Sequence, residues 1–175
     1  YPIFFDLFAE LIVDLFNIEN QNIYFLRHFL VFLFFFSSTI FFYLLIQKRF
    51  NNEFYSLLSA SILFLTPCIF SNAFFNSKDI IFLSLSTISF YFAISFLENK
   101  QLKNLILFSI TSGLLINARI YGLIIIFCFY FFFLFQGKID IKYLPKKLLL
   151  ILISFITSCF VCFLFWPFLW FDFLE

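Results

Sequence analysis

The chain has 175 residues, of which 64% are hydrophobic and only 12% are charged, and its mean hydropathy is +1.07. Soluble domains carry about 25% charged residues, so this composition excludes a water-exposed globular fold. The balance of 11 Lys and Arg against 10 Asp and Glu leaves no basic field for a polyanion, which excludes a nucleic-acid-binding protein. The chain is therefore predicted to lie in a membrane. Because it opens on Tyr1 and contains no Met, we interpret it as an internal fragment of a longer protein.

Residues 1–20 are predicted to form an amphipathic helix that lies at the outer membrane surface. Asp6, Glu10 and Asp14 recur every four residues, and apolar residues occupy the remaining faces. This segment is too charged to cross a bilayer. We expect it to lie in the interface with its three carboxylates directed toward water.

Residues 23–175 are predicted to form an all-α, polytopic bundle of about six transmembrane helices. A span needs about 20 apolar residues to cross a hydrocarbon core of about 30 Å. Polar segments interrupt the apolar sequence often enough to define these spans, which are 27–47, 55–75, 79–98, 103–117, 120–136 and 146–167.

The fourth and fifth spans are separated on the basis of length. The apolar run 105–135 would make a helix of about 46 Å, which is longer than one span requires. Arg119 and Gly122 interrupt the run near its middle, so we place a turn there.

The cations support this topology, because short cytoplasmic loops collect Lys and Arg. If the first span runs inward, the outer side holds only Arg27, Lys78 and Arg119. The inner side holds the other eight cations, which are Lys48, Arg49, Lys100, Lys103, Lys138, Lys142, Lys146 and Lys147. The bias predicts a multi-pass protein of a bacterial plasma (inner) membrane, with both chain ends on the outer, periplasmic side. We assign the inner cations to topology and to no chemistry.

Polar residues at the outer side are the candidate site. Arg119 is the most informative of them, because a helix of about 22 Å separates it from Lys103 and so places it below the outer headgroups. A buried Arg usually lines a watered cavity or meets an anion, although it can also snorkel outward. The other candidates for contact with a substrate or metal are Asn76, Asp79, Tyr121, Arg27 and His28.

The turn at residues 76–79 and the pair Arg27-His28 each have a second interpretation. Lys78 could supply a charge for a phosphate while Asp79 holds a metal or orients a sugar hydroxyl, or Asp79 could simply cap the next helix. Arg27 and His28 could likewise be an interfacial anchor. A single His is weak evidence for a metal site, so a divalent metal stays an open expectation.

Several motifs together resemble one family of membrane enzymes. They are Tyr24-Phe25-Leu26-Arg27-His28, Leu65-Thr66-Pro67, Phe74-Phe75-Asn76-Ser77-Lys78-Asp79, and Gly113 to Arg119 followed by Tyr121-Gly122. This pattern is similar to bacterial glycosyltransferases of the C-type fold, in the group of the protein mannosyltransferases and the aminoarabinose transferase of lipid A, called glycosyltransferase family 39.

The resemblance implies transfer of a sugar from a polyprenyl-phosphate carrier to an acceptor at the outer face of the membrane. By position, Lys78, Asp79 and Arg119 match the family's outer-face residues near the carrier phosphate. The family's catalytic carboxylate precedes an amphipathic helix like the one predicted here, so we expect it upstream of Tyr1. Two other classes stay open, namely a transporter or flippase for lipid-linked or anionic cargo and a noncatalytic membrane assembly subunit. A transporter would be expected to place ionisable groups near the bilayer midplane.

Overall fold

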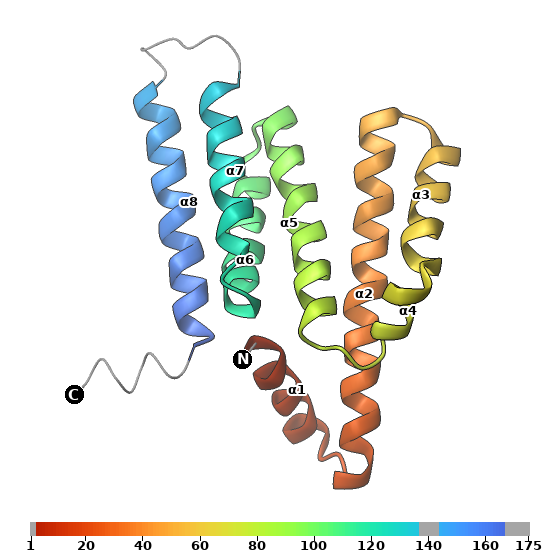
Figure 1. Cartoon of the computed structure of the whole chain (residues 1–175). Helices are drawn as coiled ribbons and strands as arrows, with labels where there is room; N and C mark the ends of the chain where they lie inside the picture. The colour runs from red at the N-terminus through yellow and green to blue at the C-terminus, as the bar shows by residue number, and fades with distance from the viewer. Residues whose placement is uncertain (1–2, 137–143, 167–175) are drawn as a thin grey trace, which may run out of the picture.

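The computed structural model describes residues 3–136 and 144–166, and all regular structure in this part of the chain is α-helical (Figure 1). This confirms the predicted all-α class. The helices are α1 (Ile3–Phe16), α2 (Asn20–Phe50), α3 (Glu53–Leu65), α4 (Pro67–Asn72), α5 (Asp79–Asn99), α6 (Leu102–Ala118), α7 (Gly122–Phe135) and α8 (Leu144–Leu164).

Successive helices run in alternating directions along one axis, apart from α1 and the short α4 (Figure 1). Three of them, α2, α5 and α8, are long and apolar enough to cross a membrane. The helices α3, α6 and α7 are apolar but have 13, 17 and 14 residues, which is about 20–26 Å of helix against a core of about 30 Å. All six predicted segments therefore contain a helix, and three of these helices are long enough to span by themselves.

The helix ends differ from the predicted boundaries where local chemistry stops or starts a helix. Asn17 adopts a left-handed conformation with φ 48°, which ends α1, and α2 begins at Asn20 rather than near residue 27. The predicted segment 55–75 is broken because Thr66 is extended and Pro67 opens a new helix, where its missing N–H costs nothing. At the other end of α3, the Asn52 side chain caps the helix by accepting bonds from the N–H groups of Phe54 and Tyr55.

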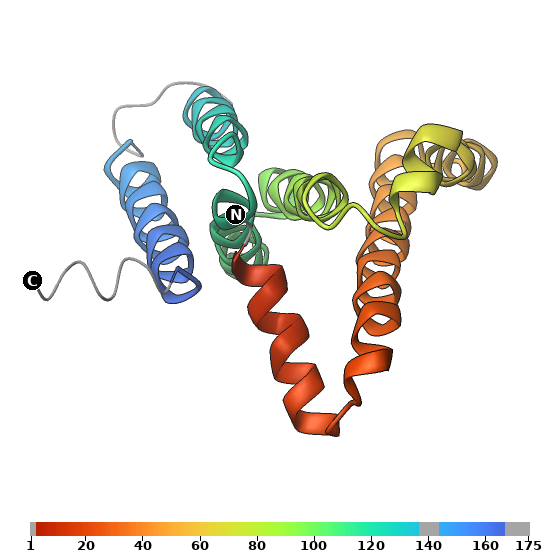
Figure 2. The same ribbon diagram turned by 60° about the horizontal axis from the view of Figure 1, so that its bottom comes forward.

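The helices form one bundle with α1 laid across its end. Helix α2 packs between α3 and α5, and α6 packs against α5, α7 and α8. Figure 2 shows α1 crossing from the end of α6 to the start of α2. One buried cluster, which includes Phe5, Phe35 and Ile81, joins α1 to α2 and α5 at this end. The opposite half of the bundle has its own cluster around Phe96, Phe108 and Phe129.

Much of the surface is apolar, as expected of a chain whose solvent is lipid. Large side chains such as Phe127, Phe131 and Phe132 on α7 are exposed. The helix directions put Arg27, Lys78 and Arg119 at the α1 end and put the described cations of the predicted inner side at the opposite end. Lys138 and Lys142 lie outside the described residues. Which end faces the cytoplasm stays a prediction.

The contact between α6 and α8 is built from small polar residues. Ser109 Oγ lies 2.7 Å from Ser154 Oγ, and Ser112 Oγ lies 2.9 Å from Ser158 Oγ. Gly113 faces the same seam, where an added Cβ would lie 2.6 Å from the Ser158 carbonyl oxygen and 2.8 Å from Val161 Cβ. The two backbones therefore approach closely, as at many helix contacts in membranes.

Gly113→Ala is expected to destabilise the protein even though Ala is the better helix former. Helix propensity alone would favour Ala by about 1 kcal/mol. The clash with the α8 backbone is expected to outweigh this and to lower the free energy of unfolding by about 1–3 kcal/mol. Thermal unfolding in detergent measures the change, and Ser37→Ala on the exposed face of α2 is the control. A higher melting temperature for Gly113→Ala would contradict this packing.

Candidate functional site

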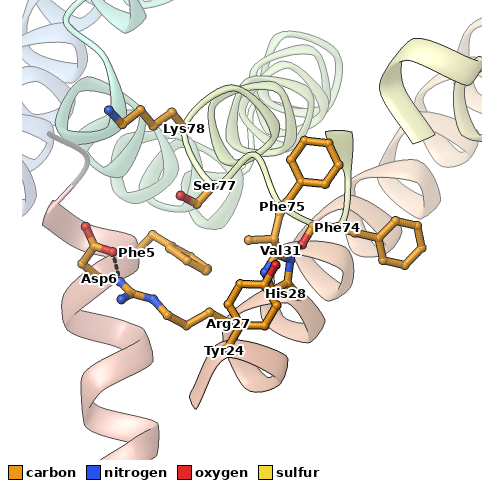
Figure 3. Close-up of a pocket in the computed structure, with 10 residues that line it drawn as sticks. All are labelled: Phe5, Asp6, Tyr24, Arg27, His28, Val31, Phe74, Phe75, Ser77 and Lys78. Carbon is orange, nitrogen blue, oxygen red and sulfur yellow. Dashed lines mark hydrogen bonds and ion pairs between the residues drawn. The ribbon is translucent and has the colours of Figure 1, made fainter. Parts of the chain in front are cut away.

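A cavity of about 370 Å³, here called the outer cavity, opens where α1, the start of α2 and the turn before α5 meet (Figure 3). Its polar lining consists of Asp6, Tyr24, Arg27, His28, Ser77 and Lys78, and its apolar lining consists of Phe5, Val31, Phe74 and Phe75. Cavities of this size hold small ligands in many proteins. The arrangement combines cations, one carboxylate and aromatic walls in one space.

Arg27 and Asp6 form an ion pair across the outer cavity, which joins α2 to α1 (Figure 3). Both side chains are about two-fifths exposed. The prediction that all three carboxylates of α1 face open water is therefore wrong for Asp6, whereas Glu10 and Asp14 are exposed as expected. Asp6 differs because it directly follows Phe5, which is buried in the core and turns this part of α1 inward.

His28 holds the turn before α5 against α2. Its Nδ1 is hydrogen-bonded to the Phe74 carbonyl oxygen, and its ring lies 4.0 Å from the Tyr24 ring, centroid to centroid. Phe74 also stacks on Phe32 of α2, with ring centroids 4.9 Å apart. These contacts place Ser77 and Lys78 at the rim of the outer cavity.

Asn76, Asp79 and Arg119 form a second polar cluster on the same turn, here called the turn cluster. The Asn76 amide donates to Asp79 Oδ2 at 2.9 Å, and the Asp79 N–H donates to Asn76 Oδ1 at 3.0 Å. The Asn76 side chain therefore satisfies the N–H of Asp79, the first residue of α5. The N-cap position, Lys78, makes no side-chain cap bond, so the interpretation that Asp79 itself caps the helix stays a prediction. Asp79 also pairs with Arg119, which follows α6. The Arg119 guanidinium is 40% exposed and so meets both the carboxylate and the surroundings.

Asn117, the next-to-last residue of α6, fixes α1 in place. Its Oδ1 accepts a bond from the Phe4 N–H at 2.9 Å, and its Nδ2 donates to the Phe165 carbonyl oxygen at 2.8 Å. The residue is buried, with 7% exposure. Asn117 thus connects three segments that are far apart in the sequence.

The structure brings most of the predicted site residues to one end of the bundle but divides them into two groups. Arg27, His28 and Lys78 line the outer cavity, whereas Asn76, Asp79 and Arg119 form the turn cluster. Lys78 is next to Asp79 in the chain, and Figure 3 shows its side chain extending from the turn without pointing at the Arg27–Asp6 pair. Tyr121 is exposed before α7 and is not part of the cavity lining. The roles of all these residues stay predictions.

Three polar lining residues were missed as site candidates from the sequence, namely Asp6, Tyr24 and Ser77. Asp6 was assigned to the water-facing side of α1, and only its position one residue after a core Phe could have indicated otherwise. Tyr24 lies one helical turn before His28, a spacing that places two rings on the same face.

The described residues do not supply a site for the divalent metal that the sequence left open. Within residues 3–136 and 144–166, no three His, Cys, Asp or Glu side chains are grouped as metal ligands. Asp6 and His28 both line the outer cavity, but Asp6 pairs with Arg27 and His28 Nδ1 bonds the Phe74 carbonyl group.

Comparison with known proteins identifies the family. The model of the family described as dolichyl-phosphate-mannose-protein mannosyltransferase matches residues 1–166, which is nearly the whole chain. A search of curated proteins and a search of solved structures find no match. The matched region includes both the outer cavity and the turn cluster. The chain therefore belongs to the dolichyl-phosphate-mannose-protein mannosyltransferase family, a family of membrane glycosyltransferases.

Proposed function

We propose that the protein transfers a sugar from a polyprenyl-phosphate donor to an acceptor at the outer, periplasmic face of a bacterial inner membrane, within a C-type glycosyltransferase fold. The observation that carries the proposal is the gathering of Arg27, His28 and Lys78 around one cavity, beside the Arg119–Asp79 pair. Among the residues that the structure describes here, the cations Arg27, Lys78 and Arg119 outnumber the carboxylates of Asp6 and Asp79, which suits a phosphate-linked donor.

The proposed reaction is a displacement at the anomeric carbon of the donor sugar. The acceptor hydroxyl oxygen forms the new bond to this carbon as the bond to the carrier phosphate oxygen breaks. The phosphate leaves with the electron pair, and the hydroxyl proton passes to a carboxylate, which we predict to precede Tyr1 in the full-length protein. Lys78 and Arg119 stabilise the negative charge that develops on the departing phosphate.

The distribution of charge favours an enzyme over a transporter. No charged residue lies between Phe29 and Gln47 of α2 or between Ile80 and Leu97 of α5. The candidate residues are instead at one end of the bundle. Transporters usually place ionisable groups near the middle of the membrane, where this chain has apolar helix.

Lys78→Ala tests the proposal in the full-length protein. Removing one charged donor from the leaving phosphate is expected to slow transfer about 10–100-fold. The assay measures transfer from a panel of labelled polyprenyl-phosphate sugars that includes mannose, in proteoliposomes. Lys103→Ala, the same change at the opposite end of the bundle, is the matched control. Equal rates for Lys78→Ala and wild type would exclude Lys78 from the site, and no transfer by wild type from any donor would contradict the function.

A further inference from the structure

A second polar cavity lies at the end of the bundle opposite the outer cavity. This basic end pocket, of about 390 Å³, is lined by Lys100, Lys146 and Lys147 together with the apolar residues Phe96, Phe133 and Leu150. Lys100 follows the last turn of α5, and the other two lysines lie in the first turn of α8. Segments almost 50 residues apart therefore contribute three like charges to one cavity.

The lysine head groups are held in place by the end of α7. Lys147 Nζ donates to the carbonyl oxygens of Leu134 and Gln136, at 3.1 and 3.0 Å, and Lys100 Nζ donates to the Gln136 side-chain oxygen. Both ammonium groups also lie over the Phe133 ring, 5.2 Å from its centroid for Lys100 and 5.9 Å for Lys147. Such cation–π contacts and hydrogen bonds fix the two charges side by side.

This arrangement gathers positive charge that the described residues do not neutralise. The described carboxylates at this end are Glu53, at the start of α3, and Glu98, which pairs with Lys48 at 3.0 Å. Neither lines the pocket. Partial burial, and then the nearby charge of Lys147, lower the pKa of Lys100. Lys146 and Lys147 also lie at the N-terminal end of α8, where the helix dipole disfavours cations and favours an anion.

We propose that the basic end pocket binds the headgroup of an anionic phospholipid. The phosphate accepts hydrogen bonds from Lys100 and Lys146. The Lys147 ammonium group, which already donates to two carbonyl oxygens, directs its third N–H at the same phosphate. The glycerol and the start of the acyl chains lie on the pocket's apolar residues, which also include Leu102, an exposed residue at the start of α6. Basic pockets between transmembrane helices are known to hold such headgroups. A soluble phosphate would meet the same lysines but would leave this apolar surface uncovered.

The test measures lipid preference around the chain reconstituted in phosphatidylcholine nanodiscs. Spin-labelled phosphatidylglycerol and spin-labelled phosphatidylcholine are compared by electron paramagnetic resonance at 0.15 M salt. A lysine near a membrane surface contributes about a fivefold preference for anionic lipid. Lys100→Gln/Lys146→Gln is therefore expected to lower the association constant of phosphatidylglycerol about 25-fold and to leave that of phosphatidylcholine unchanged.

The control is Arg49→Gln/Lys103→Gln, which removes two exposed cations from the same end of the bundle without touching the pocket. It is expected to change the phosphatidylglycerol constant by less than about threefold, because neither cation lines the pocket and charges outside it act on the headgroup only through salt-screened solvent. Equal losses in the two double variants, or no headgroup preference in wild type, would overturn the proposal. Competition by millimolar inorganic phosphate would also overturn it, because the occupant would then be a soluble anion.

Folding is checked independently by the melting temperature in pure phosphatidylcholine. If the double variant melts early, Lys146→Gln alone replaces it, because Lys146 is exposed at the rim of the pocket. This single change is expected to lower the phosphatidylglycerol constant about fivefold. An unchanged constant in a folded Lys146→Gln protein would overturn the proposed binding mode.

Discussion

Arg119→Ala in the full-length protein is expected to slow sugar transfer by about 100-fold, equivalent to about 2.7 kcal/mol of lost transition-state stabilisation. Arg119 follows α6 at the end of the bundle and pairs with Asp79, and its side chain is still 40% exposed. A guanidinium has five N–H donors, so some are left for a phosphate. A cation beside the leaving phosphate stabilises the transition state more than the bound donor, because negative charge develops on the phosphate as the bond breaks. The loss should therefore appear in kcat more than in KM, as measured with a labelled polyprenyl-phosphate sugar.

A structural role for Arg119 would produce a different pattern, which a charge exchange can reveal. Asp79→Arg/Arg119→Asp reverses the ion pair and is expected to recover most of the stability lost in Arg119→Ala. The exchanged protein should not recover sugar transfer, because its guanidinium then extends from position 79 at the start of α5 instead of from position 119 after α6. Thermal unfolding and transfer are measured on the same samples. If the exchanged protein transfers sugar at the wild-type rate, Arg119 acts only through Asp79.

The helical framework could be predicted from the sequence because its signals are local. Apolar runs fix where helices lie, and polar turns such as Asn51-Asn52 fix where they end. Asn51 ends α2 in a left-handed conformation with φ 49°, and Asn52 caps α3, so the turn needs no distant contact. The cations that the structure describes likewise divide between the two ends of the bundle as their sequence positions suggested. Hydropathy could not reveal the break at Thr66-Pro67, which divides one apolar run into α3 and α4.

The site could be predicted only in part because its geometry depends on distant contacts. The motif Asn76-Ser77-Lys78-Asp79 indicated a polar turn, and the structure forms one. The ion pairs Arg27–Asp6 and Arg119–Asp79 instead join different helices, and no spacing rule relates their members. The basic end pocket was missed for the same reason, since its lysines looked like a simple topological signal until α5 and α8 brought them together.

Asn117→Leu is expected to release α1 and to open the outer cavity. Leucine matches asparagine roughly in size but leaves the Phe4 N–H and the Phe165 carbonyl oxygen without their present partner. Each buried group left unpaired costs about 1–3 kcal/mol, so the loss of both should lower the free energy of unfolding by about 2–6 kcal/mol. Hydrogen exchange should show faster exchange of the α1 amides, and most of all of Phe4.

The same variant tests whether the fold of α1 is coupled to the proposed chemistry. Helix α1 carries Asp6, which holds Arg27 at the outer cavity, so a released α1 leaves that guanidinium unrestrained. Transfer should then fall at least tenfold, although Asn117 does not line the cavity. Asn104→Leu, the same substitution near the opposite end of α6, should leave both α1 exchange and transfer close to wild type. Fast α1 exchange together with wild-type transfer would show that the site does not need α1. The Asp6–Arg27 ion pair would then have no role in sugar transfer.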